Sequence, residues 1–503
     1  MRRLTAALTM TTTLTLIAGC TTSADNGGGT GEGDSGRPTL EMASSEVIAD
    51  AADNGVDTSA RLFESSDVVV VAADTPEDLS RGVHLAIAGG APLLTAGDQA
   101  AVGAEIERLG AERVITVGEV GPLIDGPEIT PATPAETPAS ISAGVAASLD
   151  AETAEGMEGL EHAEHPLDMP PMLATDATSL ASIATARAAG ADVHVLSYPD
   201  PRITSESMAL VTEQDVLALG DEFGSQERLD TAIEMAANGE LPGGGGLVFP
   251  GRRMIAFYGH PSGDALGVMG EQPPAEAVDR VKAHIENYQP LEEQPVVPAF
   301  EIIVTVASEF PGEDGKFTNV GNPEDFLGYI DAITDAGGYA FLDLQPGQAS
   351  FLEQAKVYED LLKRPNVGLA LDPEWNLQPG EQPLQRVGHA EAAEINEVSE
   401  WLAQLVRDNN LPQKGLIVHQ FQLQMLRDRD QINTDHPELS FILHADGHGG
   451  PEQKFDTWNV MRQDLSDDWF MAWKNFIDED NPTFTPEETY NNVDPRPWFV
   501  SYQ

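Results

Sequence analysis

The sequence predicts an α/β protein in which a parallel-sheet region over residues 43–245 precedes a (β/α)8 barrel of the TIM type over residues 250–503. Two observations favour this fold class. Short apolar runs alternate with amphipathic helical segments in both halves, and such alternation requires parallel strands joined by helical crossovers. The second half contains a strand signal roughly every 30 residues, which suits a barrel of about 250 residues.

The first 42 residues have the composition of an export signal and a linker. Arg2 and Arg3 precede an apolar, threonine-rich run over residues 4–17, which is too short for a permanent membrane span and predicts a signal peptide over residues 1–19. Cys20, the only cysteine in the chain, follows Ile-Ala-Gly. Residues 20–42 are rich in Gly, Ser, Thr and Asp, so we expect a flexible linker there.

The sequence around Cys20 resembles the lipobox of bacterial lipoproteins. In that family the cysteine is acylated and becomes the mature N-terminus, so the resemblance implies lipidation of Cys20. A chain anchored in this way lies on the outer face of the cytoplasmic membrane, facing the cell wall, without a transmembrane segment. An ordinary secretory signal with an incidental cysteine is the alternative.

Residues 61–123 contain one β-α-β-α-β unit. The valine run at 68–71 predicts a strand buried on both faces, and the helical periodicity of 76–88 ends at two glycines. A strand at 92–94, a helix at 99–109 and a strand at 113–117 complete the unit. A weaker copy can be aligned over residues 175–224, where Gly190 corresponds to Gly90 and the opening strand is poorly visible.

Three segments of the first unit resemble the cell wall-binding repeat 2 family of Gram-positive surface proteins, namely SSDVVVVAADTPEDLS, AGGAPLLTA and RVITVGEVG. The second copy has related segments, DATSLASIATARAAGADVHVL and DVLALGDEFG. The resemblance implies that this half binds cell-wall polysaccharide or peptidoglycan. A purely structural α/β domain is the alternative.

Residues 125–171 separate the two copies. They include PEITPATPAETP, and their Pro, Thr, Glu and Ala content is typical of an exposed connection outside the core. The glycine run at 243–246 predicts a hinge or an interdomain loop before the barrel.

The barrel is expected to contain eight strands, with helices in the gaps at 275–288, 323–336, 350–362 and 389–409. An open doubly wound sheet is the main alternative fold. The expected strands are residues 254–258, 301–306, 339–344, 367–371, 415–419, 440–444, 469–473 and 498–501.

Polar residues gather where these strands end, and in a (β/α)8 barrel the chemistry takes place at that face. Residues two apart on a strand share a face, so three pairs would point into one mouth. The pairs are Asp343 with Gln345, Asp372 with Glu374, and His444 with Asp446.

Paired carboxylates at such a mouth suit glycoside hydrolysis, in which one carboxylic acid protonates the leaving oxygen and a second carboxylate acts as base or nucleophile. We expect Glu374 to be the general acid, with Asp372 shifting its pKa. Asp343 or Asp446 would be the second carboxylate. Tryptophans near the rim, Trp498 included, would stack on sugar rings. The expected substrate-binding residues are Tyr258, Gln345, Trp375, His419, Gln420, His444 and Trp473.

The second half broadly resembles glycoside-hydrolase barrels. The D-x-E sequence at Asp372 and Glu374 is similar to the end of the chitinase-type fourth-strand motif, although Gly368 and Ala370 replace the acidic residues that precede it there. A capping or loop-tying role for Asp372 and Glu374 is the alternative.

A metal-dependent hydrolase is a further possibility, with ligands from the first, fifth and sixth strands. The paired H-x-H of such barrels is absent from the first strand, and the eighth strand ends without an Asp. We therefore assign no metal ligand and expect no cofactor. The residues that this alternative would use are His260, His419, His444, Asp446 and His448.

The charge balance limits the classes of partner. The chain has 83 acidic and 27 basic residues and a formal net charge of -56. Such a surface repels phosphate backbones, so nucleic acid is not an expected partner. We expect a membrane-anchored surface lipoprotein that associates with the cell wall and binds or hydrolyses an envelope glycan. A non-catalytic wall-binding or scaffolding lipoprotein is the alternative from a different class.

Overall fold

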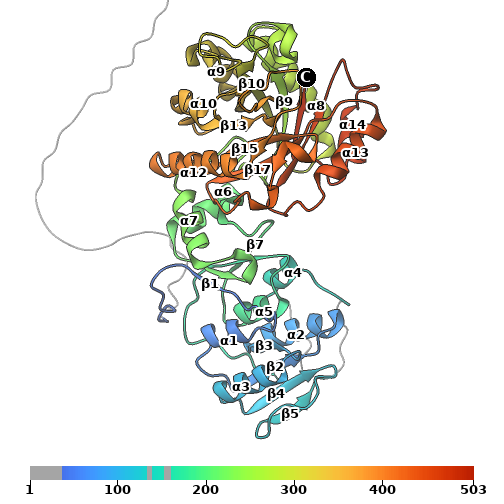
Figure 1. Ribbon diagram of the computed structural model, residues 1–503. Coiled ribbons are helices and arrows are strands. Elements are labelled where there is room, and N and C mark those ends of the chain that lie inside the picture. Colours follow the sequence, from blue (N-terminus) through green and yellow to red (C-terminus); the bar gives the residue numbers. More distant parts are fainter. Residues whose placement is uncertain (1–36, 133–138, 152–159) are drawn as a thin grey trace, which may run out of the picture.

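The computed structural model describes residues 37–132, 139–151 and 160–503. The predicted signal peptide, Cys20 and most of the predicted linker lie outside the described residues. The described chain forms two lobes, with two small sheets in the N-terminal lobe and a barrel in the C-terminal lobe (Figure 1).

The N-terminal lobe contains two four-stranded parallel sheets with equivalent strand orders, β3-β2-β4-β5 and β7-β6-β8-β1. Each β-α-β-α-β copy supplies three neighbouring strands, and one strand from outside the copy extends each sheet. The strands are β1 (Glu46–Ile48), β2 (Val68–Ala72), β3 (Leu93–Thr95), β4 (Arg113–Val117), β5 (Glu128–Pro131), β6 (Met172–Thr175), β7 (Val193–Leu196) and β8 (Leu217–Leu219).

The second copy has the opening strand that the sequence did not reveal. This strand, β6, begins at Met172, whereas the aligned copy begins at Thr175. With the sequence MLAT, β6 lacks the β-branched run that marks β2. The place that β5 has in the first sheet is taken in the second by β1, which precedes the first copy in the chain and pairs with β8.

The two copies share one hydrophobic core, to which their helices contribute. Thr185 of α5 both donates to and accepts from the backbone of Leu93 on β3, at 3.1 and 3.0 Å, and Thr58 of α1 donates to Ser182 of α5 at 2.8 Å. The helices of this lobe are α1 (Val56–Leu62), α2 (Pro76–Gly89), α3 (Gln99–Leu109), α4 (Ala143–Ser148), α5 (Leu180–Ala188), α6 (Ser205–Glu213) and α7 (Gln226–Ala236).

The connection at residues 125–171 is more ordered than its composition indicates. Residues 128–131 form β5 at the edge of the first sheet, with mostly exposed side chains. Farther along, Leu160 packs on α2 at Gly89, and the Ala163 N–H donates to the Gly89 carbonyl at 3.0 Å. The prediction of an exposed connection outside the core therefore holds for the side chains of β5, but it is wrong for Leu160, which packs against the hydrophobic core of this lobe.

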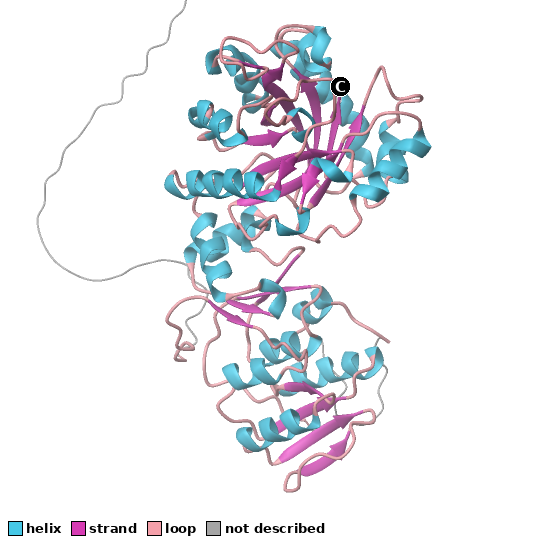
Figure 2. Cartoon of the chain, viewed as in Figure 1, coloured by secondary structure: helices cyan, strands magenta, loops and turns pink. Residues whose placement is uncertain are grey.

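The C-terminal lobe is a closed barrel of eight parallel strands, as predicted. Its strands surround a common axis, with helices on the outside (Figure 2). The open doubly wound alternative is excluded because the last strand pairs with the first. The strands are β9 (Arg253–Gly259), β10 (Val296–Ala307), β12 (Tyr339–Leu344), β13 (Val367–Leu371), β15 (Lys414–Gln420), β17 (Leu439–Ala445), β18 (Phe470–Asn475) and β19 (Phe499–Tyr502).

The four predicted helical segments form helices on the outside of the barrel, two further outer helices at residues 451–461 and 486–492 were not among them, and a short strand extends the second barrel strand. This strand, β11 (Thr318–Val320), pairs antiparallel with the end of β10. The outer helices are α8 (Pro274–Tyr288), α9 (Leu327–Asp335), α10 (Phe351–Val357), α11 (Glu359–Leu362), α12 (Ala392–Asp408), α13 (Pro451–Met461) and α14 (Pro486–Asn492).

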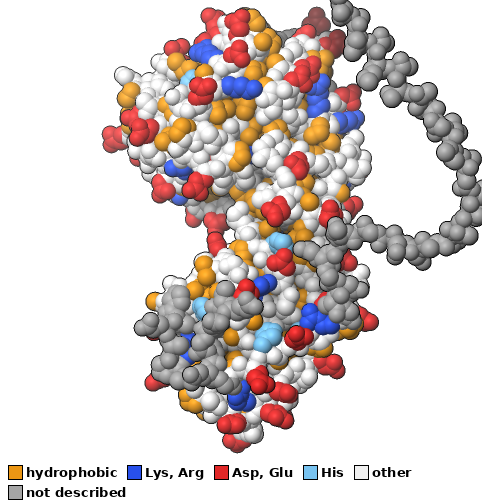
Figure 3. Space-filling view, turned by 180° about the vertical axis from the view of Figure 1, so that it is seen from behind, with side chains coloured by type: hydrophobic (Ala, Val, Ile, Leu, Met, Phe, Trp, Pro, Cys, Tyr) orange, Lys and Arg blue, Asp and Glu red, His pale blue; other side chains and the backbone are white. Residues whose placement is uncertain are grey.

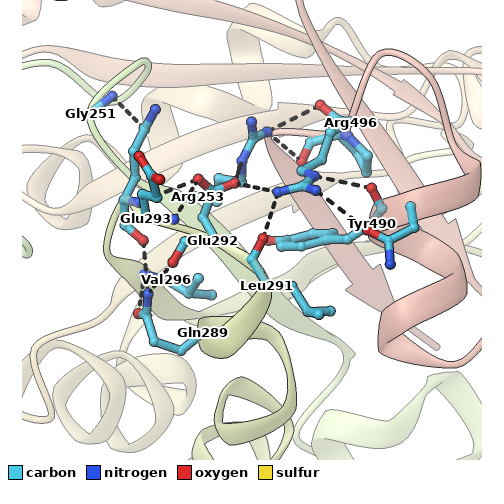
Figure 4. Close-up of polar contacts among 12 residues, drawn as sticks. Gly251, Arg253, Gln289, Leu291, Glu292, Glu293, Val296, Tyr490 and Arg496 are labelled. Carbon is cyan, nitrogen blue, oxygen red and sulfur yellow. Dashed lines mark hydrogen bonds and ion pairs between the residues drawn. The ribbon is translucent and has the colours of Figure 1, made fainter.

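The pairing of β9 with β19 closes the barrel. At the end of the barrel where these strands begin, side-chain contacts hold the two strands together (Figure 4). Glu292, which follows α8, accepts from Arg253 on β9 and from Arg496 before β19, the latter at 3.2 Å. Arg496 also donates to the Leu291 carbonyl at 2.7 Å, and Arg253 donates to the Pro497 carbonyl at 3.0 Å. One carboxylate thus joins the first strand, the last strand and the crossover that leads from β9 to β10.

The barrel interior is apolar over its lower half. Phe249 closes the bottom and packs against Phe470 and Trp498. Above it lies a layer of inward-facing apolar residues from all eight strands: Ala256, Ala299, Phe341, Ala370, Ile417, Ile442, Ala472 and Phe499.

The two lobes contact each other directly. Asn238, which follows α7, donates to the Leu411 carbonyl at 3.1 Å, and Arg202 donates to the Pro437 carbonyl at 2.8 Å. Acidic side chains are spread over both lobes on the face in Figure 3. Among the described residues, no helix combines the length and the apolarity needed to cross a bilayer.

Candidate functional site

Each barrel strand contributes one residue to the inward-facing apolar layer, and two residues later it carries a polar side chain at the mouth where the strands end. On β15, Ile417 is followed by His419, and on β10, Ala299 is followed by Glu301. A polar layer therefore lies directly above the apolar layer. Its members, in strand order, are Tyr258, Glu301, Asp343, Asp372, His419, His444, Lys474 and Ser501.

At the centre of this layer, His419 lies between two carboxylates. Its Nε2 is 2.6 Å from Glu301 Oε1 and its Nδ1 is 2.8 Å from Asp446 Oδ2. Ionised carboxylates only accept hydrogen bonds, so both ring nitrogens donate. Burial opposes the positive charge, but the charges of Glu301 and Asp446 outweigh it and hold the pKa of His419 well above its usual value. Burial also opposes the charge of Asp446, yet the His419 hydrogen bond keeps the Asp446 pKa low.

His444 lies beside this chain of contacts. Its Nε2 is 3.0 Å from Ser501 Oγ, and its Nδ1 is 3.7 Å from Glu301 Oε2. Burial lowers the pKa of His444, which favours the neutral ring. Neither His444 Nδ1 nor Glu301 Oε2 has a hydrogen-bond partner within the described part of the chain.

Tyr258 and Asp343 form the other side of the layer. The Tyr258 hydroxyl donates to Asp343 Oδ2 at 2.8 Å and accepts from Gln345 Nε2 at 3.3 Å. Lys474 Nζ is 3.7 Å from the centre of the Tyr258 ring, a cation–π contact. Burial, with the nearby charge of Glu301, raises the pKa of Asp343 to about 6.

A cavity of about 500 Å³ opens over this layer. Its wall combines carboxylates with the faces of Trp375, Phe421 and Phe476. Such a mixture of apolar surface and a few convergent polar groups is typical of a small-molecule or oligosaccharide site. Of the predicted site residues, those that line it are Tyr258, Gln345, Asp372, Glu374, Trp375 and Asp446.

Asp372 and Glu374 both reach the cavity, but they differ in role. Asp372 caps the turn after β13, where its Oδ1 accepts from the Glu374 N–H at 3.1 Å, so the loop-tying alternative holds for this residue. Burial raises the pKa of Asp372 well above its usual value. For Glu374, burial and the charge of Asp446 raise the pKa to about 7.

Other expected site residues lie away from the cavity. Trp473 is on the outer face of β18, where it packs against Trp458 and Phe484, so its expected stacking role is wrong. Gln420 ties the loop after β15, donating to the Leu423 carbonyl and accepting from Arg429. Trp498 lies at the opposite end of the barrel, next to Phe249, because it precedes its strand.

Glu301 belongs to the centre of the site, although the sequence placed it at the start of a strand. The strand β10 begins five residues earlier, at Val296, which puts Glu301 in its middle. Counting in steps of two from Ala299 would have placed Glu301 in the polar layer. Lys474 also stands at the predicted end of its strand, but the prediction chose its neighbour Trp473, which faces outward.

The histidines of the metal alternative separate into two groups. His419 and His444 offer ligand atoms that lie, together with a carboxylate oxygen of Glu301, within 4.8 Å of one another. His260 instead contacts Ser262 Oγ at 2.9 Å, and His448 packs on Phe476 at the cavity wall.

The fold and the site define a (β/α)8-barrel protein with a charged cavity at its C-terminal mouth. No family model and no curated protein matches the sequence. Among the solved structures it matches is Cwp6 from Clostridium difficile, with 11% sequence identity and a TM-score of 0.26. The match covers 54% of this chain and 64% of that chain, so this chain spans less than two thirds of Cwp6.

Proposed function

We propose that the barrel binds an envelope glycan in the mouth cavity and hydrolyses a glycosidic bond, with Glu374 as general acid and Asp446 as the second carboxylate. The observation that carries this proposal is that two carboxyl groups with oppositely shifted pKa values line the same cavity. Glu374 retains its proton up to about pH 7, whereas the pKa of Asp446 is lowered. Glycoside hydrolysis requires this division of roles.

Each group has a defined task in this reaction. Glu374 gives its proton to the glycosidic oxygen as the bond to the leaving sugar breaks. Asp446 acts on the anomeric carbon or on a water beside it, and His419 orients it through Oδ2. The half-buried Trp375 offers a ring face to a sugar, and Tyr258 is positioned to bind a hydroxyl group.

We propose further that the N-terminal lobe associates with the cell wall and that acylated Cys20 holds the chain at the membrane. The segments similar to cell wall-binding repeat 2 support the first part, and the lipobox-like sequence supports the second. Cell-wall polysaccharide or peptidoglycan would then be both the attachment surface and the source of substrate.

The test compares two Glu→Gln variants. Glu374→Gln removes the transferable proton at nearly constant shape, and Glu397→Gln makes the same change at an exposed position of α12. General acid catalysis contributes about 10²- to 10⁴-fold to a rate, so release of reducing ends from wall polysaccharide should fall by that factor in Glu374→Gln only. Equal release by both variants would reject Glu374 as the acid.

Binding without turnover is the result that favours the alternative function. Wild-type protein that sediments with wall polysaccharide but releases no reducing ends would be a non-catalytic wall-binding lipoprotein.

A further inference from the structure

Four buried side chains lie together in the polar layer, and the ligand atoms of three of them, Glu301, His419 and His444, lie within 4.8 Å of one another. They come from four different strands: Glu301 from β10, Asp343 from β12, His419 from β15 and His444 from β17. All four side chains are fully buried. The atoms at issue are Glu301 Oε2, Asp343 Oδ1, His419 Nε2 and His444 Nδ1.

Three of these atoms lack the hydrogen bonds that buried polar atoms normally make. Glu301 Oε2, Asp343 Oδ1 and His444 Nδ1 have no such partner among the residues that the structure describes. Leaving one buried polar atom unsatisfied costs about 1–3 kcal/mol, so three in one cluster require an explanation. A cation between Glu301 Oε2 and His444 Nδ1, which are 3.7 Å apart, would satisfy both of these atoms at once.

The separations suit a transition metal. His444 Nδ1 is 3.7 Å from Glu301 Oε2, and His419 Nε2 is 3.9 Å from Asp343 Oδ1. Ligands that are each about 2.1 Å from a Zn²⁺ ion lie roughly 3 to 4 Å apart. The closer contact of 2.6 Å between Glu301 Oε1 and His419 Nε2 carries a proton, which leaves when the metal takes its place.

Three of these side chains also make a hydrogen bond through the nitrogen or oxygen atom that faces away from the cluster. Asp446 accepts from His419 Nδ1, Ser501 Oγ contacts His444 Nε2, and Tyr258 donates to Asp343 Oδ2. Metal-binding imidazoles and carboxylates are usually oriented in this way, with the free nitrogen or oxygen directed at the ion.

We propose that Glu301, His419 and His444 form a binding site for one divalent transition-metal ion, with Asp343 as a neighbouring carboxylate 3.9 Å from His419 Nε2, and Zn²⁺ is the probe. Two imidazoles with carboxylates favour zinc and its first-row neighbours over Mg²⁺ or Ca²⁺, which prefer oxygen ligands alone. The site lies beside the cavity wall, since Asp446 contacts both. This inference goes beyond glycan hydrolysis and does not depend on it.

The test measures zinc in the purified full chain without any glycan present. After treatment with EDTA, addition of ZnCl₂ and gel filtration, the wild type should retain one zinc per chain. His444→Gln and Glu301→Gln should lose it while keeping the far-UV circular dichroism of the wild type. His260→Gln, a histidine change outside the cluster, should retain one zinc per chain.

A milder variant and a spectroscopic measurement cover the case in which the ligand variants fail to fold. Ser501→Ala removes only the group that holds His444 and should weaken zinc binding by about 10- to 100-fold. X-ray absorption of the zinc-loaded wild type should count two imidazole ligands. Absence of zinc from the wild type, full zinc in His444→Gln, or fewer than two imidazoles would overturn the site.

This outcome is separable from the proposed reaction. Glu374→Gln should keep its zinc, so a protein that binds zinc but releases no sugar would reject the hydrolase and leave the metal site standing.

Discussion

Glu374 and Asp446 lie on the same cavity wall, and their pKa values are shifted in opposite directions. Asp446 is buried and Glu374 is half-buried, which penalises the charged form of both carboxylates. Asp446 receives a hydrogen bond from His419, whereas Glu374 faces the negative charge of Asp446. The His419 hydrogen bond thus favours the ionised form of Asp446, and the charge of Asp446 in turn favours the protonated form of Glu374.

The raised pKa of Glu374 has a consequence for stability. It moves from an ordinary 4.5 to about 7, so between these values the folded protein binds a proton that the unfolded chain does not. The free energy of unfolding therefore falls as the pH rises from 4.5 to 7, and it stays reduced above. Glu374→Gln removes this penalty. As the pH rises from 4.5 to 8, the free energy of unfolding of the variant should therefore increase relative to that of the wild type by up to about 3 kcal/mol.

Urea unfolding of both proteins at the two pH values checks this prediction. The protein is kept in EDTA, because a nearby cation would lower the pKa of a carboxyl group. A stability difference that is the same at pH 4.5 and pH 8 would contradict the raised pKa.

At the residue scale, the sequence revealed those polar residues that stand at strand ends. Asp343, Asp372, Glu374, His444 and Asp446 were found in this way. Glu301 was missed because the run Val-Val-Pro-Ala-Phe before it hid the start of β10, Pro being uncommon inside a strand.

At the scale of elements, closure of the barrel depends on how its first and last strands are joined. Glu292 receives hydrogen bonds from Arg253 and Arg496, and all three side chains are partly or largely buried (Figure 4). Arg253 also lies over the Trp498 ring, 4.2 Å from its centre. The last strand is thereby fixed to the first and to the end of α8.

Glu292→Gln should accordingly destabilise the barrel. It leaves two arginines without their carboxylate, which should lower the free energy of unfolding by about 2 to 4 kcal/mol. Glu293→Gln, the same change at the next and exposed position, is the matched control. Equal urea midpoints for the two variants would show that the stability of the barrel does not depend on this ion pair.

Strands and helices with strong periodicity were predicted within one or two residues, as for α3, β4, β12 and β13. The elements that were missed include the short or polar strands β1, β5 and β6, which are strands because neighbouring backbones pair with them. Tertiary pairing of this kind leaves little trace in the local sequence.

At the scale of the whole molecule, the described chain places a two-copy lobe directly before a barrel whose mouth carries the candidate site (Figure 1). On the face shown in Figure 3, acidic side chains are spread over both lobes and form no single patch. The predicted anchor, Cys20, precedes the first described residue by 17 positions, which leaves room for a tether.

Cys20→Ser tests the anchor. The wild type should incorporate labelled palmitate and fractionate with membranes, because acylation requires the thiol. The variant should lose the label and appear in the aqueous fraction, while Thr22→Ser should behave as the wild type does. A Cys20→Ser protein that stays with the membranes would reject lipidation at this residue.

The central claim is that the barrel cleaves a glycosidic bond with Glu374 as the acid. The most direct test measures the reducing ends released from purified cell-wall polysaccharide and peptidoglycan. It compares the wild-type protein that begins after Cys20 with its Glu374→Gln variant. Glycosidic cleavage in the barrel predicts steady release by the wild type, at least about 10²-fold slower release by the variant, and undiminished binding by both. Binding by both proteins with no release by the wild type would contradict the hydrolase, and undiminished release by the variant would place the catalytic acid elsewhere.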